Sequence, residues 1–308
     1  MNSRCLTDKI KAEAKSLGFF ACGIAEARPV DAATVTAYRQ WIADGCHATM
    51  HYLADNIDKR LDPRLLMDGV RSIVSVALSY APSQRIADDK YQIACYAYGK
   101  DYHDVMKRKL HTLAARCGIT DYRAFCDTAP VLERYWAEQA GLGWIGRNHQ
   151  LIIPHAGSQF FLGELFLTEE LEYDTPARNR CGTCHACIDV CPTQYLTPNS
   201  LLQTPYSCLS YLTIEHRGTF TDSERKAVAT QPEPKYIYGC DRCQQVCPWN
   251  RFATPTSEPD FQPSPALLSM TKEQWHTLTE DQYRHLFKGS AVKRAKYDGL
   301  IRNIQTLT

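Results

Sequence analysis

The stretch Cys181-Gly-Thr-Cys184-His-Ala-Cys187-Ile-Asp-Val-Cys191-Pro192 places four thiols in the order C-x2-C-x2-C-x3-C-P. This spacing is typical of thiolates that hold [4Fe–4S] clusters. Structural zinc sites are usually built from isolated C-x2-C pairs, and a third cysteine followed by x3-C-P is not a zinc spacing. The stretch therefore predicts an iron–sulfur domain rather than a zinc ribbon.

A second cysteine set is required downstream, because in bacterial two-cluster ferredoxins the fourth cysteine of such a run ligates the other cluster. Cys240-Asp-Arg-Cys243-Gln-Gln-Val-Cys247-Pro248 repeats the end of the run, and Cys208 stands between the two sets. We call this exchange of the last cysteine between the two clusters the cross-over rule. If it applies to both sets, each thiol is used once. The rule assigns Cys181, Cys184, Cys187 and Cys247 to one cluster, and to the other Cys191, Cys208, Cys240 and Cys243.

The bulk composition is that of an ordinary globular chain, with 308 residues, 44% hydrophobic and 22% charged. A formal net charge of +1 gives no overall attraction to nucleic acid, so a polyanion site must be a local patch. The longest apolar stretch, residues 73–81, is too short to cross a bilayer, and the N-terminus carries no secretion signal. We therefore expect a cytoplasmic protein with no membrane partner, in which the cysteines form no disulfide framework.

The hydrophobic pattern ahead of the cysteines predicts a mixed domain of helices and strands. Residues 71–80 form an almost continuous apolar run, which is typical of a central, buried strand. The glycine-rich segment 141–148 matches no nucleotide-binding fingerprint but would let the backbone approach a flat ligand. The other expected elements are strands at 19–25 and 122–126, a hairpin at 151–154 and 160–167, and helices at 7–17, 33–44, 104–117 and 130–141.

Two polar segments of this domain each allow two interpretations. Residues 91–103 combine four tyrosines with Lys100, Asp101 and His103, and they predict either a tyrosine-anchored loop or a ligand site. Asp127 follows a predicted strand and precedes a predicted helix. It would serve either as a helix cap, the commoner role at such a position, or as a catalytic acid.

The C-terminal part begins with several prolines and continues with short predicted helices at 271–278 and 280–286. The last element, residues 288–303, is predicted to be one basic amphipathic helix. A solvated face is the ordinary role of such a helix, whereas beside an RNA it would contact phosphates. The candidates for such contacts are Lys293, Arg294 and Lys296.

The cluster pattern also indicates the kind of chemistry. Two cubanes transfer single electrons and do not themselves bind an organic substrate. The preceding domain must therefore receive these electrons, and a second cofactor between clusters and substrate is expected.

Six segments, taken in order, resemble those of the epoxyqueuosine reductases, a family related to reductive dehalogenases. The resemblance covers nearly the whole chain. It implies an α+β fold with a nitroreductase-like α/β cobalamin-binding domain at 1–172, a bacterial two-cluster ferredoxin-like domain at 173–254 and a short helical segment at 255–308. The six segments are Lys59-Arg60-Leu-Asp-Pro63, Tyr98–His103, Asp127–Arg134, Ala140–Asn148, Cys208–Glu215 and Gly239–Asn250.

This resemblance implies an oxidoreductase that reduces epoxyqueuosine to queuosine at the wobble position of tRNA, using two [4Fe–4S] clusters and base-off cobalamin. An external ferredoxin or flavodoxin would supply the electrons, and the chain is expected to act as a monomer. Asp127 would be the general acid, because opening an epoxide leaves an alkoxide that needs a proton. Burial against the corrin would raise the pKa of Asp127 and keep it protonated. The candidate cobalamin contacts are Arg60, Cys95, Asp127, Asn148, Leu151, Ile152, Ile153 and Leu162, and the candidate tRNA contacts are those of the basic helix.

Other classes of protein remain as alternatives. A two-cluster electron-transfer protein would need no second cofactor, and a reductive dehalogenase-like enzyme would use cobalamin on another substrate. A flavin enzyme is a third alternative, because a shared fold does not determine the cofactor.

Overall fold

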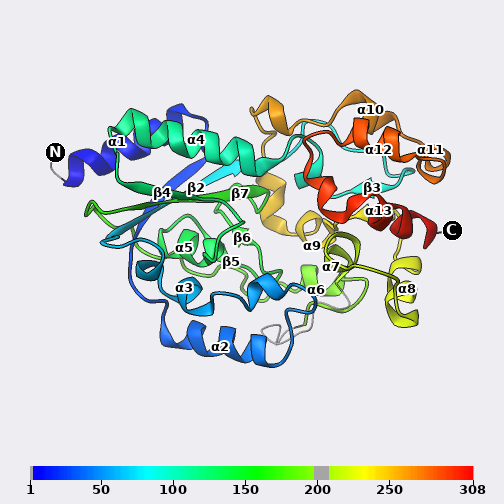
Figure 1. Ribbon diagram of the computed structural model, residues 1–308, viewed down its shortest axis with the longest axis horizontal. Coiled ribbons are helices and arrows are strands. Elements are labelled where there is room, and N and C mark those ends of the chain that lie inside the picture. Colours follow the sequence, from blue (N-terminus) through cyan, green and yellow to red (C-terminus); the bar gives the residue numbers. More distant parts are fainter. Residues whose placement is uncertain (1–2, 198–207, 308) are drawn as a thin grey trace.

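An antiparallel sheet of four strands forms the centre of the N-terminal half (Figure 1). The computed structural model describes residues 3–197 and 208–307. β2 is hydrogen-bonded on both edges, to β1 and β7, and seven of its eight residues are buried, which confirms the predicted central strand. In spatial order the strands are β1 (Ala21–Glu26), β2 (Ser72–Ser79), β7 (Phe160–Leu167) and β4 (Tyr122–Phe125).

Helices cover both faces of this sheet. Figure 1 shows α1 (Ser3–Ser16) and α4 (Tyr102–Cys117) on one side and α5 (Glu133–Gln139) on the other. α4 begins at the cap residue Asp101, whose carboxylate accepts a hydrogen bond from the backbone N–H of His103. This cap fixes the direction of the first turn of α4. Farther out on the α5 side lie α2 (Ala32–Ala43), η1 (His51–Leu53), α3 (Ile57–Leu61) and η2 (Pro63–Leu65).

The cysteine motifs lie in a second region made of short helices. The chain reaches this region early, because β3 (Gln92–Ile93) pairs in parallel with β8 (Tyr236–Tyr238). α13 (Lys296–Gln305) packs on β8 and α7, so the C-terminal segment supports the cysteine region. The other elements are η3 (Cys95–Ala97), α6 (Ala186–Asp189), α7 (Leu209–Ile214), α8 (Asp222–Ala229), α9 (Arg242–Gln245), η6 (Pro248–Phe252), η7 (Pro259–Phe261), α10 (Pro265–Ser269), α11 (Lys272–His276), α12 (Glu280–Leu286) and η8 (Ala291–Ala295).

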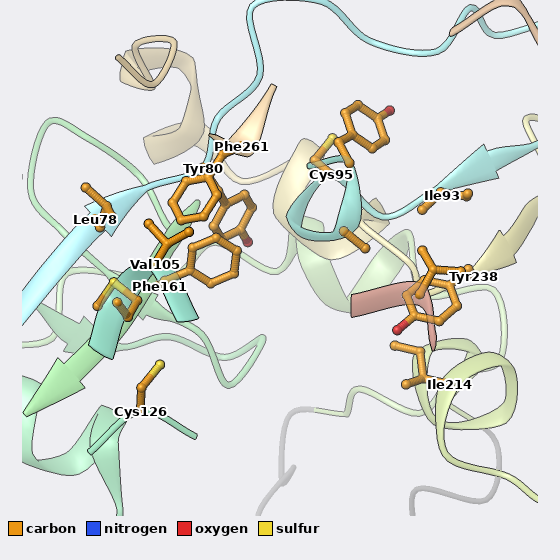
Figure 2. Packing of buried hydrophobic residues seen from close by; sticks show 14 of the residues in the cluster. Leu78, Tyr80, Ile93, Cys95, Val105, Cys126, Phe161, Ile214, Tyr238 and Phe261 are labelled. Atoms are coloured by element: carbon orange, nitrogen blue, oxygen red, sulfur yellow. The ribbon is translucent and has the colours of Figure 1, made fainter. Parts of the chain in front are cut away.

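One hydrophobic core joins the two regions. Figure 2 shows Leu78 and Phe161 of the sheet on one side of the view and Tyr238 of the cysteine region on the other, with Cys95 between them. All four side chains are at most 6% exposed. The sheet and the cysteine region are therefore held together by continuous apolar packing, and not by a flexible linker.

Two elements differ from the sequence prediction. The predicted hairpin is wrong, because β7 pairs with β2 and β4 while β6 (Leu151–Ile152) pairs with β5 (Trp144–Ile145). The predicted basic helix is also interrupted, since Lys296 has φ of 60° and separates the 3-10 helix η8 from α13. Within residues 3–197 and 208–307, none of the helices combines the length and the apolar character needed to span a lipid bilayer.

Candidate active site

Asp127 lies in the loop between β4 and α5, and two residues of the first turn of α4 contact its carboxylate. Tyr102 Oη donates a hydrogen bond to Asp127 Oδ2 at 2.5 Å, and His103 Nε2 lies 3.2 Å from the same oxygen. One carboxylate oxygen is therefore held by a phenol and an imidazole from the same helix turn.

The imidazole of His103 lies between two carboxylates. Its Nδ1 is 2.6 Å from Asp101 Oδ1, while its Nε2 faces Asp127. The ring of Tyr102 stacks on that of His103 at 4.1 Å and on that of Phe161 at 4.3 Å, which fixes both hydrogen-bonding groups. Because each ring nitrogen faces a carboxylate oxygen, the arrangement favours the doubly protonated imidazolium.

The charges of this network differ from what the sequence suggested. Burial lowers the pKa of His103, but the hydrogen bonds to Asp101 and Asp127 outweigh it and raise the pKa to about 9. Desolvation raises the pKa of Asp127, yet the hydrogen bonds from His103 and Tyr102 outweigh that effect and hold it below its ordinary value. The side chain of Asp127 is 58% exposed, and hydrogen bonding keeps its pKa below the ordinary value. Protonation of Asp127 by burial against a corrin stays a prediction.

The interpretation of Asp127 as a helix cap is also wrong. α5 begins at Glu133, and its cap position is Leu132, which makes no side-chain capping bond. Asp127 instead has a left-handed backbone, with φ of 58°, and its N–H donates to Glu133 Oε1. Pro130 lies in the same loop, ahead of the helix that it was expected to begin.

The glycines of segment 141–148 serve chain packing. A Cβ on Gly143 would lie 2.1 Å from the carbonyl oxygen of Ile152, and one on Gly146 would meet the Ile152 side chain at 2.5 Å. These glycines let β5 and β6 approach each other closely. The structure thus gives them a role other than the expected approach to a flat ligand.

The candidate cofactor residues fall into separate groups. Arg60 is 8% exposed; its Nη2 donates to the carbonyl oxygen of Tyr52 at 3.1 Å, and its Nε has no hydrogen-bond partner among the described residues. Cys95 is 2% exposed, and its N–H donates to Asp241 Oδ2 at 2.7 Å, which ties this segment to the second cysteine motif. The aliphatic candidates pack in the core on the α5 side: Leu151, Ile153 and, less deeply buried, Leu162.

Four thiols of the two motifs surround one cavity. Asn148 and Ile152 also line it, and the indole Nε1 of Trp144 lies 3.4 Å from the Sγ of Cys181, within range of an N–H···S hydrogen bond. This gathers a residue of the second motif with three of the first, in the combination that the cross-over rule predicts. The four thiols are Cys181, Cys184, Cys187 and Cys247.

The other four thiols are partly buried and influence one another electrostatically. Burial raises the pKa of Cys240 to about 12, and the nearby thiol of Cys208 raises it further. Cys208 is itself coupled electrostatically to Cys191, and Cys243 to both Cys240 and Cys208. The fold therefore brings the first predicted set of four thiols together around one cavity, and the second set stays a prediction that these couplings favour.

The basic residues near the C-terminus are not equivalent. Arg294 makes a two-pronged ion pair with Glu215, with Nε–Oε1 and Nη2–Oε2 distances of 2.9 and 2.7 Å. Its guanidinium also lies 5.5 Å from the ring centroid of Tyr52. Lys293 and Lys296 are exposed. All three side chains are exposed, but the charge of Arg294 is already paired with Glu215, whereas no ion pair is found for the two lysines among the described residues.

Two buried carboxyls near the Asp127 loop were not among the predicted site residues. Glu133 contacts the loop directly, and Glu164 is completely buried on β7. The sequence did carry a signal for Glu164, because it is the one charged residue in the apolar run Phe160-Phe-Leu-Gly-Glu-Leu-Phe-Leu167.

These features define a double-cluster iron–sulfur oxidoreductase. Residues 180–250 match the family model described as a 4Fe-4S double cluster binding domain, and residues 60–128 match the model described as epoxyqueuosine reductase QueG, DUF1730. The chain belongs to the epoxyqueuosine reductase family. It is 44% identical to the epoxyqueuosine reductase of Cellulophaga algicola, over 98% of this chain and 97% of that one, and 44% identical to that of Leadbetterella byssophila, over 98% of each.

Solved structures agree with this membership. A crystal structure of epoxyqueuosine reductase with an epoxyqueuosine-modified tRNA-Tyr stem loop has a TM-score of 0.84 and 27% identity, over 98% of this chain and 80% of that one. The Bacillus subtilis epoxyqueuosine reductase, whose catalytic loop is swung out of its active site, has a TM-score of 0.83 and 26% identity, over 98% and 81%. The α+β fold with its double-cluster domain is thus that of the family.

Proposed function

We propose that this chain reduces epoxyqueuosine to queuosine at the wobble position of tRNA. The observation that carries the proposal is the Asp101–His103–Asp127 network, which places a transferable proton beside an open carboxylate. A relative that matches 98% of this chain was crystallised with an epoxyqueuosine-modified stem loop, which supports the same substrate class.

The residues present fit the cofactors of such a reaction. The cavity among Cys181, Cys184, Cys187 and Cys247 fits one cubane, and the buried set of Cys191, Cys208, Cys240 and Cys243 fits the other. The unpaired Nε of Arg60 fits an acceptor group on a corrin side chain. When bound, the clusters supply single electrons and cobalamin supplies a reducing metal centre to the epoxide.

The residues of the network control the proton. Opening an epoxide leaves an alkoxide oxygen, which needs one proton to become a hydroxyl and a second, from solvent, to depart as water. His103 Nε2 carries the first of these protons at neutral pH and transfers it through the carboxylate of Asp127, whose side chain is 58% exposed. Asp101 holds the imidazole ring by its other nitrogen, and Tyr102 orients the carboxylate. The proton donor is thus a pair of residues rather than Asp127 alone.

The proposal also covers the partners of the chain. Lys293 and Lys296 are assigned to phosphate contacts with the tRNA, because they are exposed. Arg294, already paired with Glu215, contributes less. The electrons come from an external ferredoxin or flavodoxin, and the chain acts as a cytoplasmic monomer.

The test is anaerobic turnover of tRNA that carries epoxyqueuosine, followed by mass analysis of its nucleosides. The wild type with both clusters and cobalamin is expected to form queuosine, and the same protein without cobalamin is expected to form none. Cys247→Ser should lose one cluster, about half of the iron, and the activity. Cys5→Ser, at an exposed cysteine outside both motifs, is the matched control and should retain both clusters.

Two results would contradict the proposal. Absence of queuosine from the wild type, with corrin and both clusters bound, would rule out this substrate. Failure to bind corrin at all, with both clusters intact, would favour a two-cluster electron-transfer protein instead.

A further inference from the structure

Glu164 is a carboxyl that the proposed chemistry does not use. It lies in the middle of β7, is 0% exposed, and neither of its oxygens accepts a hydrogen bond from an N–H or hydroxyl group of the described residues. The residue opposite it on β2, Ser75, is also 0% exposed and its hydroxyl has no described partner. An isolated ionised carboxylate at such a position is strongly disfavoured, so Glu164 must carry a proton or share one.

The neighbour that can share this proton is Glu133, the first residue of α5. Burial raises the pKa of Glu133 to about 7, with a further contribution from Asp127. Burial and then Glu133 raise the pKa of Glu164 well above its ordinary value. Two carboxyls that interact this strongly do not ionise independently, and one proton shared between them removes most of the repulsion.

The pair lies directly behind the Asp127 loop. Glu164 is paired in the sheet with Phe125, the last residue of β4, and Asp127 follows two residues later. Asp127 N–H donates to Glu133 Oε1, so the three acidic residues form a line from the centre of the sheet to the candidate site. The left-handed backbone of Asp127, with φ of 58°, is unfavourable for a residue with a side chain and needs support from its surroundings.

We propose that Glu164 and Glu133 form a proton-sharing carboxyl pair that holds the Asp127 loop in the orientation in which its carboxylate meets His103. The protonated Glu164 donates to Glu133, and Glu133 then accepts the N–H of Asp127. Glu133 and Glu164 are thus positioning residues for the proton donor, and this inference rests on the function proposed above for Asp127.

Other ionisable groups around the pair do not replace this arrangement. Arg134, also on α5, is exposed, and Lys107 of α4 lies 3.4 Å from Thr128 Oγ1. The buried thiol of Cys126 has a pKa raised well above its ordinary value by burial and then by Glu133, so it remains neutral. Asp127 is the nearest further charge, and it adds to the repulsion. A shared proton is therefore the local means of stabilising the pair.

The test is amide hydrogen exchange of the cluster-loaded protein without substrate, resolved to Asp127 and the adjacent loop. Glu133→Ala removes the acceptor and is expected to speed exchange at Asp127 by at least about tenfold. Glu164→Leu removes the proton donor and should also speed it. Glu164→Gln keeps a donor toward Glu133 and should stay within about twofold of the wild type.

Glu138→Gln is the matched control, because Glu138 lies on the same helix and accepts the N–H of Ile145 at 2.9 Å. It should leave exchange at Asp127 unchanged. Unchanged protection of Asp127 in Glu133→Ala would overturn the inference, and so would equal exchange rates in Glu164→Gln and Glu164→Leu. If Glu133→Ala or Glu164→Leu fails to fold, Glu133→Gln is used in its place, because its amide retains one acceptor oxygen. Its Asp127 amide should exchange faster than in the wild type but slower than expected without the acceptor. Its kcat should be lower and its KM unchanged.

The two proposals can fail separately. Faster exchange in Glu133→Ala together with a wild type that forms no queuosine would support the carboxyl pair and reject the function. Queuosine formation together with unchanged exchange would support the function and reject the pair.

Discussion

Asp127 and the carboxyl pair behind its loop lie close together, but their pKa values are shifted in opposite directions. Asp127 is exposed, has the imidazolium of His103 beside it, and its pKa lies below the ordinary value. Glu164 is completely buried behind the loop and contacts no cation among the described residues, Glu133 is half-buried there, and the pKa values of both are raised. Whether a pKa is raised or lowered therefore depends on the charge of the neighbouring group as much as on burial. At neutral pH the loop therefore has an ionised carboxylate in front of it and a protonated carboxyl behind it.

The strongest test of this comparison is Asp127→Asn. The amide keeps the shape of the side chain but neither stabilises the charge of His103 nor passes a proton, so the rate of queuosine formation should fall by about 10²–10⁴. Single-turnover kinetics with both clusters and cobalamin bound measure this loss. Asp104→Asn is the control, because Asp104 is an exposed aspartate in the turn of α4 that carries His103; it should retain the wild-type rate. A rate within about threefold of the wild type in Asp127→Asn would remove Asp127 from the proton path.

The pH dependence of the reaction rate in His103→Gln distinguishes a proton supplied by His103 from one supplied by the Asp127 carboxyl. In the wild type the pKa of His103 is raised to about 9, so the proton is present below that pH and the rate should fall as the pH rises through about 9. In His103→Gln only the carboxyl can supply a proton, so the fall should move to the acidic range of an ordinary aspartate, about pH 4. At pH 7 the variant should be slower by about 10–100-fold.

His111→Gln is the control for that experiment, because His111 lies on the same helix and contacts Tyr122 instead. Its profile should match that of the wild type. A descending limb that stays near pH 9 in His103→Gln would assign it to another group and contradict the proton store on His103.

The parts of this arrangement that depend on local patterns were visible in the sequence. The cysteine spacing predicted two sets of four thiols, and the apolar run of β2 predicted a central strand. The helix predicted at 280–286 likewise has the observed bounds of α12, Glu280–Leu286, and the structure shows Thr279 as its cap. In each case the physical cause lies within a few neighbouring residues.

The parts that the sequence did not predict depend on partners far along the chain. β7 left its predicted hairpin because β2 and β4, more than 30 residues away, offer longer edges to its apolar residues. The low pKa of Asp127 comes from His103, on a helix 24 positions earlier. The position of that imidazole cannot be read from the sequence spacing, so its effect on the pKa of Asp127 was not predicted.

The stability of the folded protein should report the buried pair. Because the pKa of Glu133 is raised in the folded state, its contribution is complete below the unfolded value of about 4.5 and is lost as the pH rises through about 7. The loss should be on the order of 1–3 kcal/mol. Glu133→Gln removes the group that titrates, so its melting temperature should fall less than that of the wild type between pH 5 and pH 8.

The quantity compared is the change in melting temperature with pH in each protein, so a destabilisation by the substitution that does not depend on pH cancels. His103, whose pKa is raised from 6.5 to about 9, loses its own contribution across that range in both proteins, so this loss cancels when the two curves are compared. Parallel melting curves for Glu133→Gln and the wild type from pH 5 to 8 would show that Glu133 does not ionise there.

The smallest expected effect extends the same principle, that the partner determines what a charge does, to the C-terminal basic residues. Lys293 and Lys296 are exposed, whereas the charge of Arg294 is already neutralised by Glu215. Replacing both lysines by alanine should therefore weaken tRNA binding several-fold at physiological salt and lower the slope of log Kd against log salt by about 1–2. Arg294→Ala should change the slope by less than about 0.5, because few counterions are released from a paired charge. Equal changes of slope in the two variants would show that Glu215 gives up Arg294 when RNA binds, and that pairing in the free protein does not decide which residues contact the phosphates.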